Sequence, residues 1–311
     1  MKLPVAVIIP TLNCREKLAR HLDAIEEWLP FVEEIIAVDS NSIDGTRELL
    51  EERLQPHGGQ VITTGPGLYK AWNLAASRAT QPYLYYSTIC DVISKDGLAE
   101  LAHLMGENDL DVIISPPKIV CSDGLSEEKT KWPIHYVLKY LSFKKEVAIL
   151  DELQKQYMVS AFLPASIIGS SASNFYRTEV IQKNPFPLDV GTVGDSLWAL
   201  KNLPLLRVGI ARKQYATFCW DGVRNGTWDE SGELMEKFKN ESLKLEHGSH
   251  TIGYINDHLT EECVRLQAAI NEYDDYVKFL TRPWSVKMKD FVLKYTSVRY
   301  WYGVLVSSLK K

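Results

Sequence analysis

The sequence has no long apolar run and few cysteines, and both shortages limit its class. Nowhere among the 311 residues does an apolar stretch approach the ~18 residues that a membrane-spanning helix needs. The five cysteines are scattered and odd in number, so they provide neither a disulfide framework nor a CxxC metal pair. We therefore expect a cytoplasmic protein in a reducing compartment.

The glycine-rich loops that bind phosphate are also missing. The first apolar run, residues 5–9, is not followed by GxGxxG, and the chain has no GxxxxGK[ST] segment. Because those loops bring backbone N–H groups against phosphates, their absence argues against a dinucleotide-binding Rossmann site and a P-loop NTPase. Pro10 and Asn13 interrupt the apolar N-terminus, and no small-residue cleavage site follows, so we predict a first strand rather than a signal peptide.

Positive charge is scarce over most of the chain. The formal net charge is −5, yet residues 281–311 carry seven Lys or Arg and one acid. That local charge of +6 leaves −11 for residues 1–280. Since nucleic-acid binding depends on clustered positive charge, the main body is not predicted to bind nucleic acid.

The sequence does contain a regular alternation of strand and helix patterns. Apolar, β-rich runs predict strands at residues 5–9, 33–40, 60–65, 83–89, 110–115 and 171–177. Amphipathic spacing predicts helices at residues 18–29, 45–54, 68–79, 95–105 and 196–202. This alternation predicts an α/β fold with a mostly parallel sheet flanked by helices. Ligands of such sheets bind at the carboxyl ends of the strands, where Thr11, Asn13, Asp39 and Asp91 lie.

A change of character after Trp228 predicts the domain organisation. Residues 1–228 are expected to form the main domain, and residues 229–311 a helical C-terminal region with a basic amphipathic tail. Apolar residues between 255 and 280 recur at spacings of three and four, close to a heptad seam. We favour a helix that packs on its own domain, and a homodimeric coiled coil stays open as the alternative.

Three segments together resemble the nucleotide-sugar-binding half of family 2 glycosyltransferases, which have the GT-A fold. They are "VIIPTLN" (7–13), "EEIIAVDSNSIDGT" (33–46) and "GPGLYKAWNLAASRATQPYLYY" (65–86). The resemblance covers about the first 200 residues and is specific only in combination. It implies an inverting glycosyltransferase that moves a sugar from a nucleotide diphosphate sugar to an acceptor hydroxyl, in polysaccharide or glycan assembly.

The resemblance also implies a metal site at the end of the fourth strand. That strand leads into "TICD" (88–91), where the family has a DxD-type motif, and only the last acid is present. A single carboxylate can bind Mn²⁺ or Mg²⁺ when the donor diphosphate supplies further oxygens. Asp91 is therefore the predicted metal ligand, with Cys90 beside it among the donor-binding residues. The alternative for Asp91 is a turn residue, although Ser94 is the better helix cap.

The remaining donor-binding residues follow from the same resemblance. Asp39 is predicted to contact the base or ribose of the nucleotide, because a carboxylate accepts hydrogen bonds from both. Pro10, Thr11 and Asn13 are predicted to line the same pocket. Asp44 differs, since it precedes Gly45 and a helix and is typical of a turn.

A later acidic motif predicts the catalytic base. "GTVGDSLWALK" (191–201) resembles the family segment in which an Asp removes the proton of the acceptor hydroxyl, a role that falls to Asp195. The alternative is that Asp195 caps the following helix, and the two roles are compatible. His247 and His250 could complete a metal site, but two histidines in a Gly/Ser context are more often solvated loop residues.

The C-terminal tail and the competing functions remain open at this level. Residues 286–311 interleave basic and aromatic side chains, which suits either an anionic membrane carrying a lipid-linked acceptor or a helix docked on the domain. The first alternative would place the protein at the inner face of the membrane. A sugar-nucleotidyl transferase is a weaker alternative, because "PTLNCREK" (10–17) lacks the glycines of its phosphate loop. A non-catalytic nucleotide- or glycan-binding relative is the third.

Overall fold

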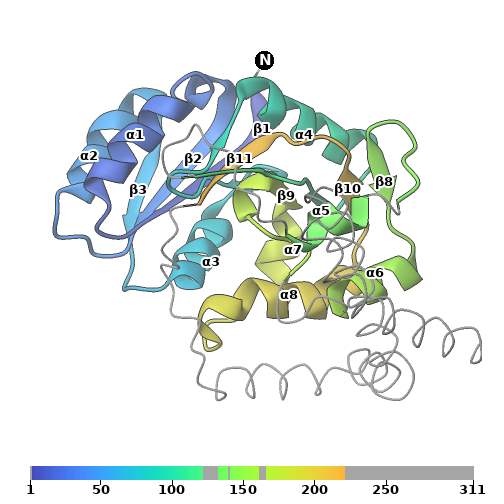
Figure 1. The fold of residues 1–311 in the computed structure, drawn as a ribbon. Helices are drawn as coiled ribbons and strands as arrows, with labels where there is room; N and C mark the ends of the chain where they lie inside the picture. The colour runs from blue at the N-terminus through green and yellow to red at the C-terminus, as the bar shows by residue number, and fades with distance from the viewer. Residues whose placement is uncertain (1, 122–131, 139–140, 161–165, 221–311) are drawn as a thin grey trace, which may run out of the picture. The chain divides into compact units, whose positions relative to one another are not determined.

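The computed structural model describes residues 2–121, 132–138, 141–160 and 166–220 (Figure 1). The chain divides into two compact units, Met1–Ile252 and Gly253–Lys311, and all described residues belong to the first. The expected boundary at residue 228, the apolar seam between 255 and 280 and the basic tail lie outside the described residues. They stay predictions. No helix in the described part of the chain is long and apolar enough to cross a bilayer.

The N-terminal half alternates strands and helices as predicted. Its elements are β1 (Leu3–Thr11), α1 (Arg15–Ile25), β2 (Val32–Asp39), α2 (Thr46–Leu54), β3 (Gln60–Thr63), α3 (Leu68–Arg78), β4 (Tyr83–Tyr86), α4 (Lys95–Glu107) and β6 (Val112–Ile114). The first predicted helix ends early, because Leu29 belongs to a separate 3₁₀ turn, η1 (Leu29–Phe31), that contains Pro30. Ser94 caps α4, as predicted, by accepting the N–H of Gly97 at 3.1 Å.

The second half adds shorter elements. They are β7 (Lys118–Cys121), α5 (Pro133–Val137), β8 (Val147–Ile149), α6 (Glu152–Ser160), η4 (Ser171–Ser173), β9 (Asn174–Arg177), α7 (Thr178–Lys183), η5 (Gly191–Val193), α8 (Gly194–Asn202), η6 (Leu203–Leu205), β10 (Val208–Ala211) and β11 (Ala216–Trp220). Two further short elements are η2 (Gln55–His57) and β5 (Val92–Ile93). The strand expected at 171–177 begins only at Asn174, because the three serine-rich residues before it form the η4 turn.

The main sheet is mostly parallel, as predicted, with the strand order β3-β2-β1-β4-β9-β6-β10-β8. β1 is parallel to β2 and β4, and β6 is parallel to β10. β9 is antiparallel to both β4 and β6 and separates them, although those two strands are neighbours in the alternating pattern of the sequence. A segment from late in the chain therefore occupies the centre of the sheet.

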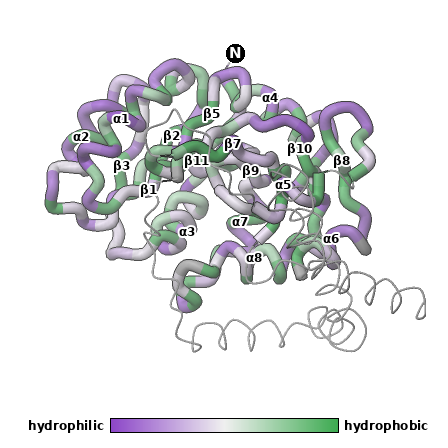
Figure 2. Tube along the Cα trace, viewed as in Figure 1, coloured by the Kyte–Doolittle hydropathy of each residue, from purple (hydrophilic) through white to green (hydrophobic). Residues whose placement is uncertain are grey.

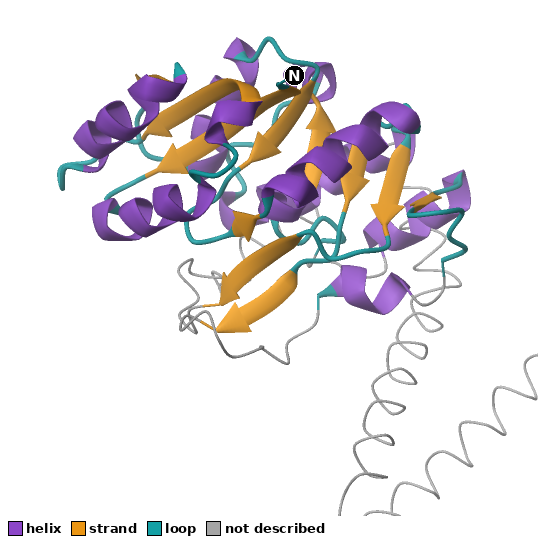
Figure 3. Cartoon of the chain, turned by 90° about the horizontal axis from the view of Figure 1, so that it is seen from above, coloured by secondary structure: helices purple, strands orange, loops and turns teal. Residues whose placement is uncertain are grey.

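Helices cover both faces of this sheet (Figures 1 and 3). The side chains of β1 alternate between the two faces: Val5, Val7 and Ile9 pack with α1, α2 and α4, whereas Ala6 and Ile8 pack with α3, α7 and α8. This two-sided burial is why the strand is a continuous apolar run. Figure 2 shows the hydrophobic strands between helices whose outer faces are hydrophilic.

A smaller sheet stands beside the main one (Figure 3). In it β11 pairs antiparallel with β5 and parallel with β7. β5 directly follows the segment that contains Asp91, so the small sheet brings β11 against the end of β4. This arrangement closes one side of the candidate site.

Candidate functional site

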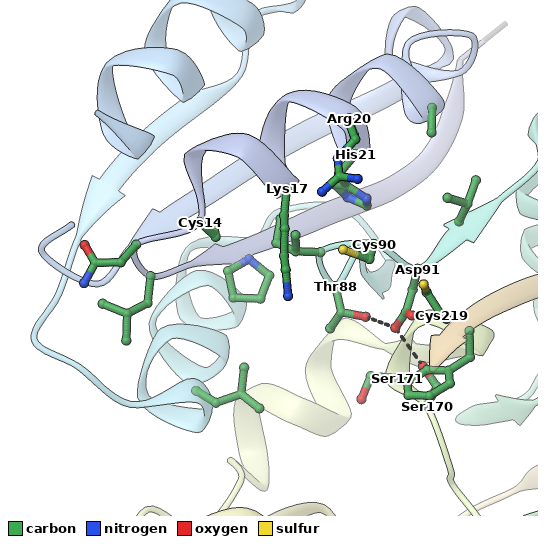
Figure 4. A pocket seen from close by; sticks show the side chains of 18 of the residues that line it. Cys14, Lys17, Arg20, His21, Thr88, Cys90, Asp91, Ser170, Ser171 and Cys219 are labelled. Atoms are coloured by element: carbon green, nitrogen blue, oxygen red, sulfur yellow. Dashed lines mark hydrogen bonds between the residues drawn. The ribbon is translucent and has the colours of Figure 1, made fainter. Parts of the chain in front are cut away.

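A cavity of about 1330 Å³ lies at the carboxyl ends of β1 and β4 (Figure 4). Its wall combines the loop after β1, the exposed side of α1, the start of α3, the β4–β5 loop, η4, the start of α8 and β11. Five of the seven predicted site residues line it: Pro10, Asn13, Cys90, Asp91 and Asp195. The structure therefore places residues from the carboxyl ends of β1 and β4 in one cavity, as the alternating pattern predicted. Asp195, from much later in the chain, lines the same cavity.

Thr11 and Asp39 lie beneath this cavity rather than on its wall. They are only 4% and 1% exposed. Oδ1 of Asp39 accepts the Thr11 hydroxyl at 3.3 Å, and Oδ2 accepts the N–H of Ser42 at 2.9 Å. In this structure Asp39 ties the loop after β2 to the end of β1. A direct contact of Asp39 with a nucleotide stays a prediction.

The loops after β1 and β2 hold each other through side-chain contacts with the backbone. Asn13 has a φ of 44°, its N–H donates to the Ser42 hydroxyl at 2.9 Å, and its Oδ1 accepts the N–H of Ile43 at 2.9 Å. Asp44 accepts the N–H of Arg15 and both the N–H and the hydroxyl of Thr46. These bonds lower the pKa of Asp44 and agree with the turn role predicted for it.

Asp91 is almost buried and joins three segments. Its Oδ2 accepts the hydroxyls of Thr88 at 2.6 Å and Ser170 at 3.2 Å, both shown in Figure 4. Its Oδ1 accepts the N–H of Cys219 on β11 at 3.1 Å. Burial raises the pKa of Asp91 to about 7, and these three bonds lower it only in part. Cys90 before it has a φ of 76°, a left-handed conformation that strains most non-glycine residues.

Asp91 has little capacity left to coordinate a cation. A carboxylate offers about four lone pairs, and three are used here by protein donors. Among the residues that the structure describes, no group of three His, Cys, Asp or Glu side chains could hold a metal ion. Asp91 therefore fits a cation that obtains most of its oxygen ligands from a bound diphosphate and water.

Asp195 lies in the first turn of α8, on the opposite side of the β4 end from α1. Val193 occupies the N-cap position, so Asp195 is not the helix cap of the alternative interpretation. Its Oδ1 accepts the N–H of Ser196 at 2.7 Å, and its own N–H donates to the Tyr69 hydroxyl at 3.0 Å. Burial raises the pKa of Asp195 to about 6, which suits a group that takes up a proton near neutral pH.

The basic side of the cavity was not predicted from the sequence. Arg15, Lys17 and Arg20 of α1 line it, and Figure 4 shows Lys17 extending from the helix into the cavity. The spacing of Lys17 and Arg20 could have identified these two, since residues three apart share one face of a helix. They supply positive charge where an anionic ligand would meet Asp91.

His21 lies on the same helix but is only 2% exposed. Its Nε2 shares a hydrogen bond of 3.0 Å with the hydroxyl of Ser87, at the end of β4. Burial lowers its pKa to about 4, so the ring is neutral at physiological pH. His247 and His250, by contrast, lie outside the described residues.

Comparison with known proteins gives the family and the fold. The family model "Glycosyl transferase family 2" matches residues 6–163. A curated relative, a PGL/p-HBAD biosynthesis glycosyltransferase of Mycobacterium bovis (strain BCG / Pasteur 1173P2), is 28% identical over 147 residues. The match covers 46% of this chain and 55% of the relative, so the chain spans about half the length of the curated relatives that it matches.

Two solved structures show the same fold. The S. aureus TarS 1-349 complex with UDP-GlcNAc has a TM-score of 0.58 and 21% identity, over 81% of this chain and 69% of that one. The mannosyltransferase PcManGT of Pyrobaculum calidifontis, in complex with GDP-Man and Mn²⁺, has a TM-score of 0.50 and 15% identity. That likeness covers 94% of this chain and 86% of that one. The mostly parallel, helix-flanked sheet is thus the GT-A glycosyltransferase fold. Because the family model matches just over half of its residues, the chain belongs to glycosyl transferase family 2.

Proposed function

We propose that the chain is a glycosyltransferase that moves a sugar from a nucleotide diphosphate sugar to an acceptor hydroxyl, with inversion at the anomeric carbon. The observation that carries the proposal is the meeting of Asp91 and Asp195 in one cavity at the carboxyl ends of the sheet. Their position suits a donor diphosphate on one side and an acceptor on the other. The solved structures of similar fold contain UDP-GlcNAc and GDP-Man, which supports this class of donor.

Asp195 is the base of the proposed reaction. The acceptor oxygen attacks the anomeric carbon, the bond from that carbon to the diphosphate oxygen breaks, and the diphosphate leaves with the bonding electrons. The proton of the acceptor hydroxyl passes to Asp195, which is ionised at neutral pH because its pKa is about 6. A single displacement of this kind inverts the anomeric configuration.

The donor is held by the loops at the β1 and β2 ends. Pro10, Asn13 and Cys90 line the cavity, which supports the proposal that the first two contact the nucleotide and that Cys90 lies near the diphosphate. Thr11 and Asp39 support these loops from below through the bonds to each other and to Ser42. Lys17 and Arg20 add positive charge on the α1 side, where a diphosphate would meet it.

Asp91 would hold the divalent cation predicted from the sequence, Mn²⁺ or Mg²⁺, together with oxygens of the donor. When bound, such a cation neutralises the charge that develops on the leaving diphosphate. Since Asp91 is the sole predicted carboxylate for this role, the cation and the donor should bind together. Mn²⁺ is present in the PcManGT complex, which supports a divalent cation here.

The acceptor is proposed to be a glycan or a lipid-linked sugar. The curated mycobacterial relative is named for PGL/p-HBAD biosynthesis, and this supports an acceptor in glycan assembly. Attachment to the inner face of an anionic membrane through residues 286–311, and a homodimer, stay predictions because the segments that would carry them lie outside the described residues.

A donor panel tests the proposal. The purified chain is incubated with UDP-, GDP- and dTDP-sugars and Mn²⁺, and the release of nucleoside diphosphate is measured. We expect release from one nucleotide class, and its loss in Asp195→Asn. Binding of a nucleotide sugar without any release would instead support the non-catalytic relative. Formation of pyrophosphate from a nucleoside triphosphate and a sugar phosphate would support the nucleotidyl transferase.

A further inference from the structure

The start of α8 depends on a residue from a distant helix. The first N–H groups of a helix have no partner within the helix, and Val193 at the N-cap position contributes no side-chain acceptor. The acceptor for the N–H of Asp195 is the hydroxyl of Tyr69 on α3, at 3.0 Å and 126 residues away in sequence. The same hydroxyl also forms a hydrogen bond with the Asp195 side chain. One group thus holds both the backbone and the carboxylate of the proposed base.

We propose that Tyr69 is the positioning residue for Asp195, and that α3 aligns the base with the cavity. This inference rests on the proposed function of Asp195. A base contributes to catalysis only when its oxygen is held within hydrogen-bond reach of the acceptor hydroxyl. A carboxylate on the first turn of a helix without its own side-chain cap would otherwise move with that turn.

The ring of Tyr69 is itself fixed by its neighbours. It is 7% exposed, stacks on Phe186 with a centroid distance of 5.6 Å and meets Trp72 edge-on at 5.4 Å. Gly194 allows this close approach, because a Cβ at that position would lie 2.4 Å from the Tyr69 ring. The hydroxyl therefore has one position relative to the start of α8.

A second residue of α3, Asn73, binds the backbone of the later segment one turn after Tyr69. Asn73 donates its Nδ2–H to the carbonyl of Phe186 at 2.7 Å, and its Oδ1 accepts the N–H of Phe186 at 2.9 Å. Residues four apart share a helix face, so Tyr69 and Asn73 act on the same incoming segment. Gln182 adds bonds to the carbonyls of Ala76 and Ala79 at 3.0 and 3.1 Å. Within the segment 65–86, whose sequence resembles the family, Tyr69 and Asn73 therefore fix the position of α3 relative to the residues from Phe186 to Asp195.

Two tyrosines on elements other than α8 interact electrostatically with the Asp195 carboxylate. Tyr69 approaches from α3 and Tyr176 from β9, and burial raises the pKa of both, so both are uncharged at neutral pH. The bond from the Tyr69 hydroxyl stabilises the ionised form of Asp195 and lowers its pKa. Removal of this hydroxyl should raise the pKa of Asp195 as well as loosen its position.

Tyr69→Phe tests the proposal, with Tyr86→Phe as its matched control. Tyr86 belongs to the same aromatic cluster, and its buried hydroxyl has no hydrogen-bond partner within the described part of the chain. For Tyr69→Phe we expect kcat at pH 7 to fall by on the order of tenfold, with the donor KM within about twofold, because the base acts in the chemical step. The acid limb of the kcat–pH profile should move to higher pH. Tyr86→Phe should leave kcat and the acid limb of the profile unchanged.

The outcomes separate this inference from the proposed function. If Asp195→Asn retains transfer, the base assignment itself fails. If Asp195→Asn is inactive while Tyr69→Phe keeps the wild-type kcat and acid limb, only the role of Tyr69 is overturned. A lower melting temperature of Tyr69→Phe without a shifted limb would also overturn it, as a purely structural effect. Should Tyr69→Phe not fold, Gly194→Ala decides, since its methyl group displaces the Tyr69 ring: a shifted limb supports the proposal and an unchanged profile refutes it.

Discussion

The pH dependence of transfer is a direct consequence of the environment of Asp195. Burial against α3 and β9 raises its pKa to about 6, despite the opposing bonds from Ser196 and Tyr69. A base accepts a proton only when it is ionised. With saturating donor and Mn²⁺, which favour the ionised form of Asp91, activity should therefore be complete above the pKa of Asp195 and lost as the pH falls through it. One pH unit below the pKa about a tenth of the carboxyl groups are ionised. We therefore expect kcat at pH 5 to be about a tenth of its value at pH 8.

Asp195→Asn removes the base while retaining the shape of the side chain. The amide oxygen can still accept the N–H of Ser196, so folding and nucleotide binding should change little. Loss of a general base typically lowers the rate by on the order of 10²–10⁴, and the remaining activity should lack the acid limb near pH 6. Asp109→Asn is a suitable control, because Asp109 is 86% exposed, pairs with Arg177 and does not line the cavity.

The assay measures release of nucleoside diphosphate from pH 5 to 8, with donor and acceptor saturating, and nucleotide affinity by calorimetry. A rate for Asp195→Asn within about tenfold of wild type would refute the role in proton removal. An acid limb that persists in the variant would show that another group titrates. Loss of nucleotide binding or of the fold in the variant would make Asp195 a structural residue instead.

Three further substitutions have defined outcomes. Asp91→Asn should abolish Mn²⁺-dependent nucleotide binding in calorimetry with an unchanged circular dichroism spectrum, and full Mn²⁺ stimulation in the variant would contradict the ligand role. Cys90→Gly should raise the free energy of unfolding in urea by about 0.5–1 kcal/mol, because glycine adopts the φ of 76° without strain; a decrease would refute this. Native His21 has a pKa of about 4, below its unfolded value, so the unfolded chain binds the proton more tightly and stability falls as the pH drops from about 6.5 to 4. His21→Gln should remove on the order of 2 kcal/mol of the stability difference between pH 7 and pH 5, and an unchanged difference would exclude this cause.

Local sequence patterns determined most of the fold of the first 115 residues. β1 and β2 contain apolar runs rich in β-branched residues, and α4 starts after the serine that was predicted to cap it. Apart from the short β5, strands and helices alternate along this part of the chain. Such elements depend on interactions between residues a few positions apart, which the sequence displays directly. The acids at the strand ends were predictable for the same reason, since a parallel sheet places its carboxyl ends at one edge.

The tertiary structure decided which of these groups reach the cavity and what holds them. β9 enters between β4 and β6, the turn that precedes it brings Ser170 to Asp91, and α8 meets Tyr69 across 126 residues. Asp39 closes a strand as predicted, yet it lies beneath the cavity because Thr11 and Ser42 engage its carboxylate. Pairings of this kind join segments far apart in the chain, and their stability depends on the packing of the whole sheet. Such long-range pairings cannot be predicted from the spacing of neighbouring residues.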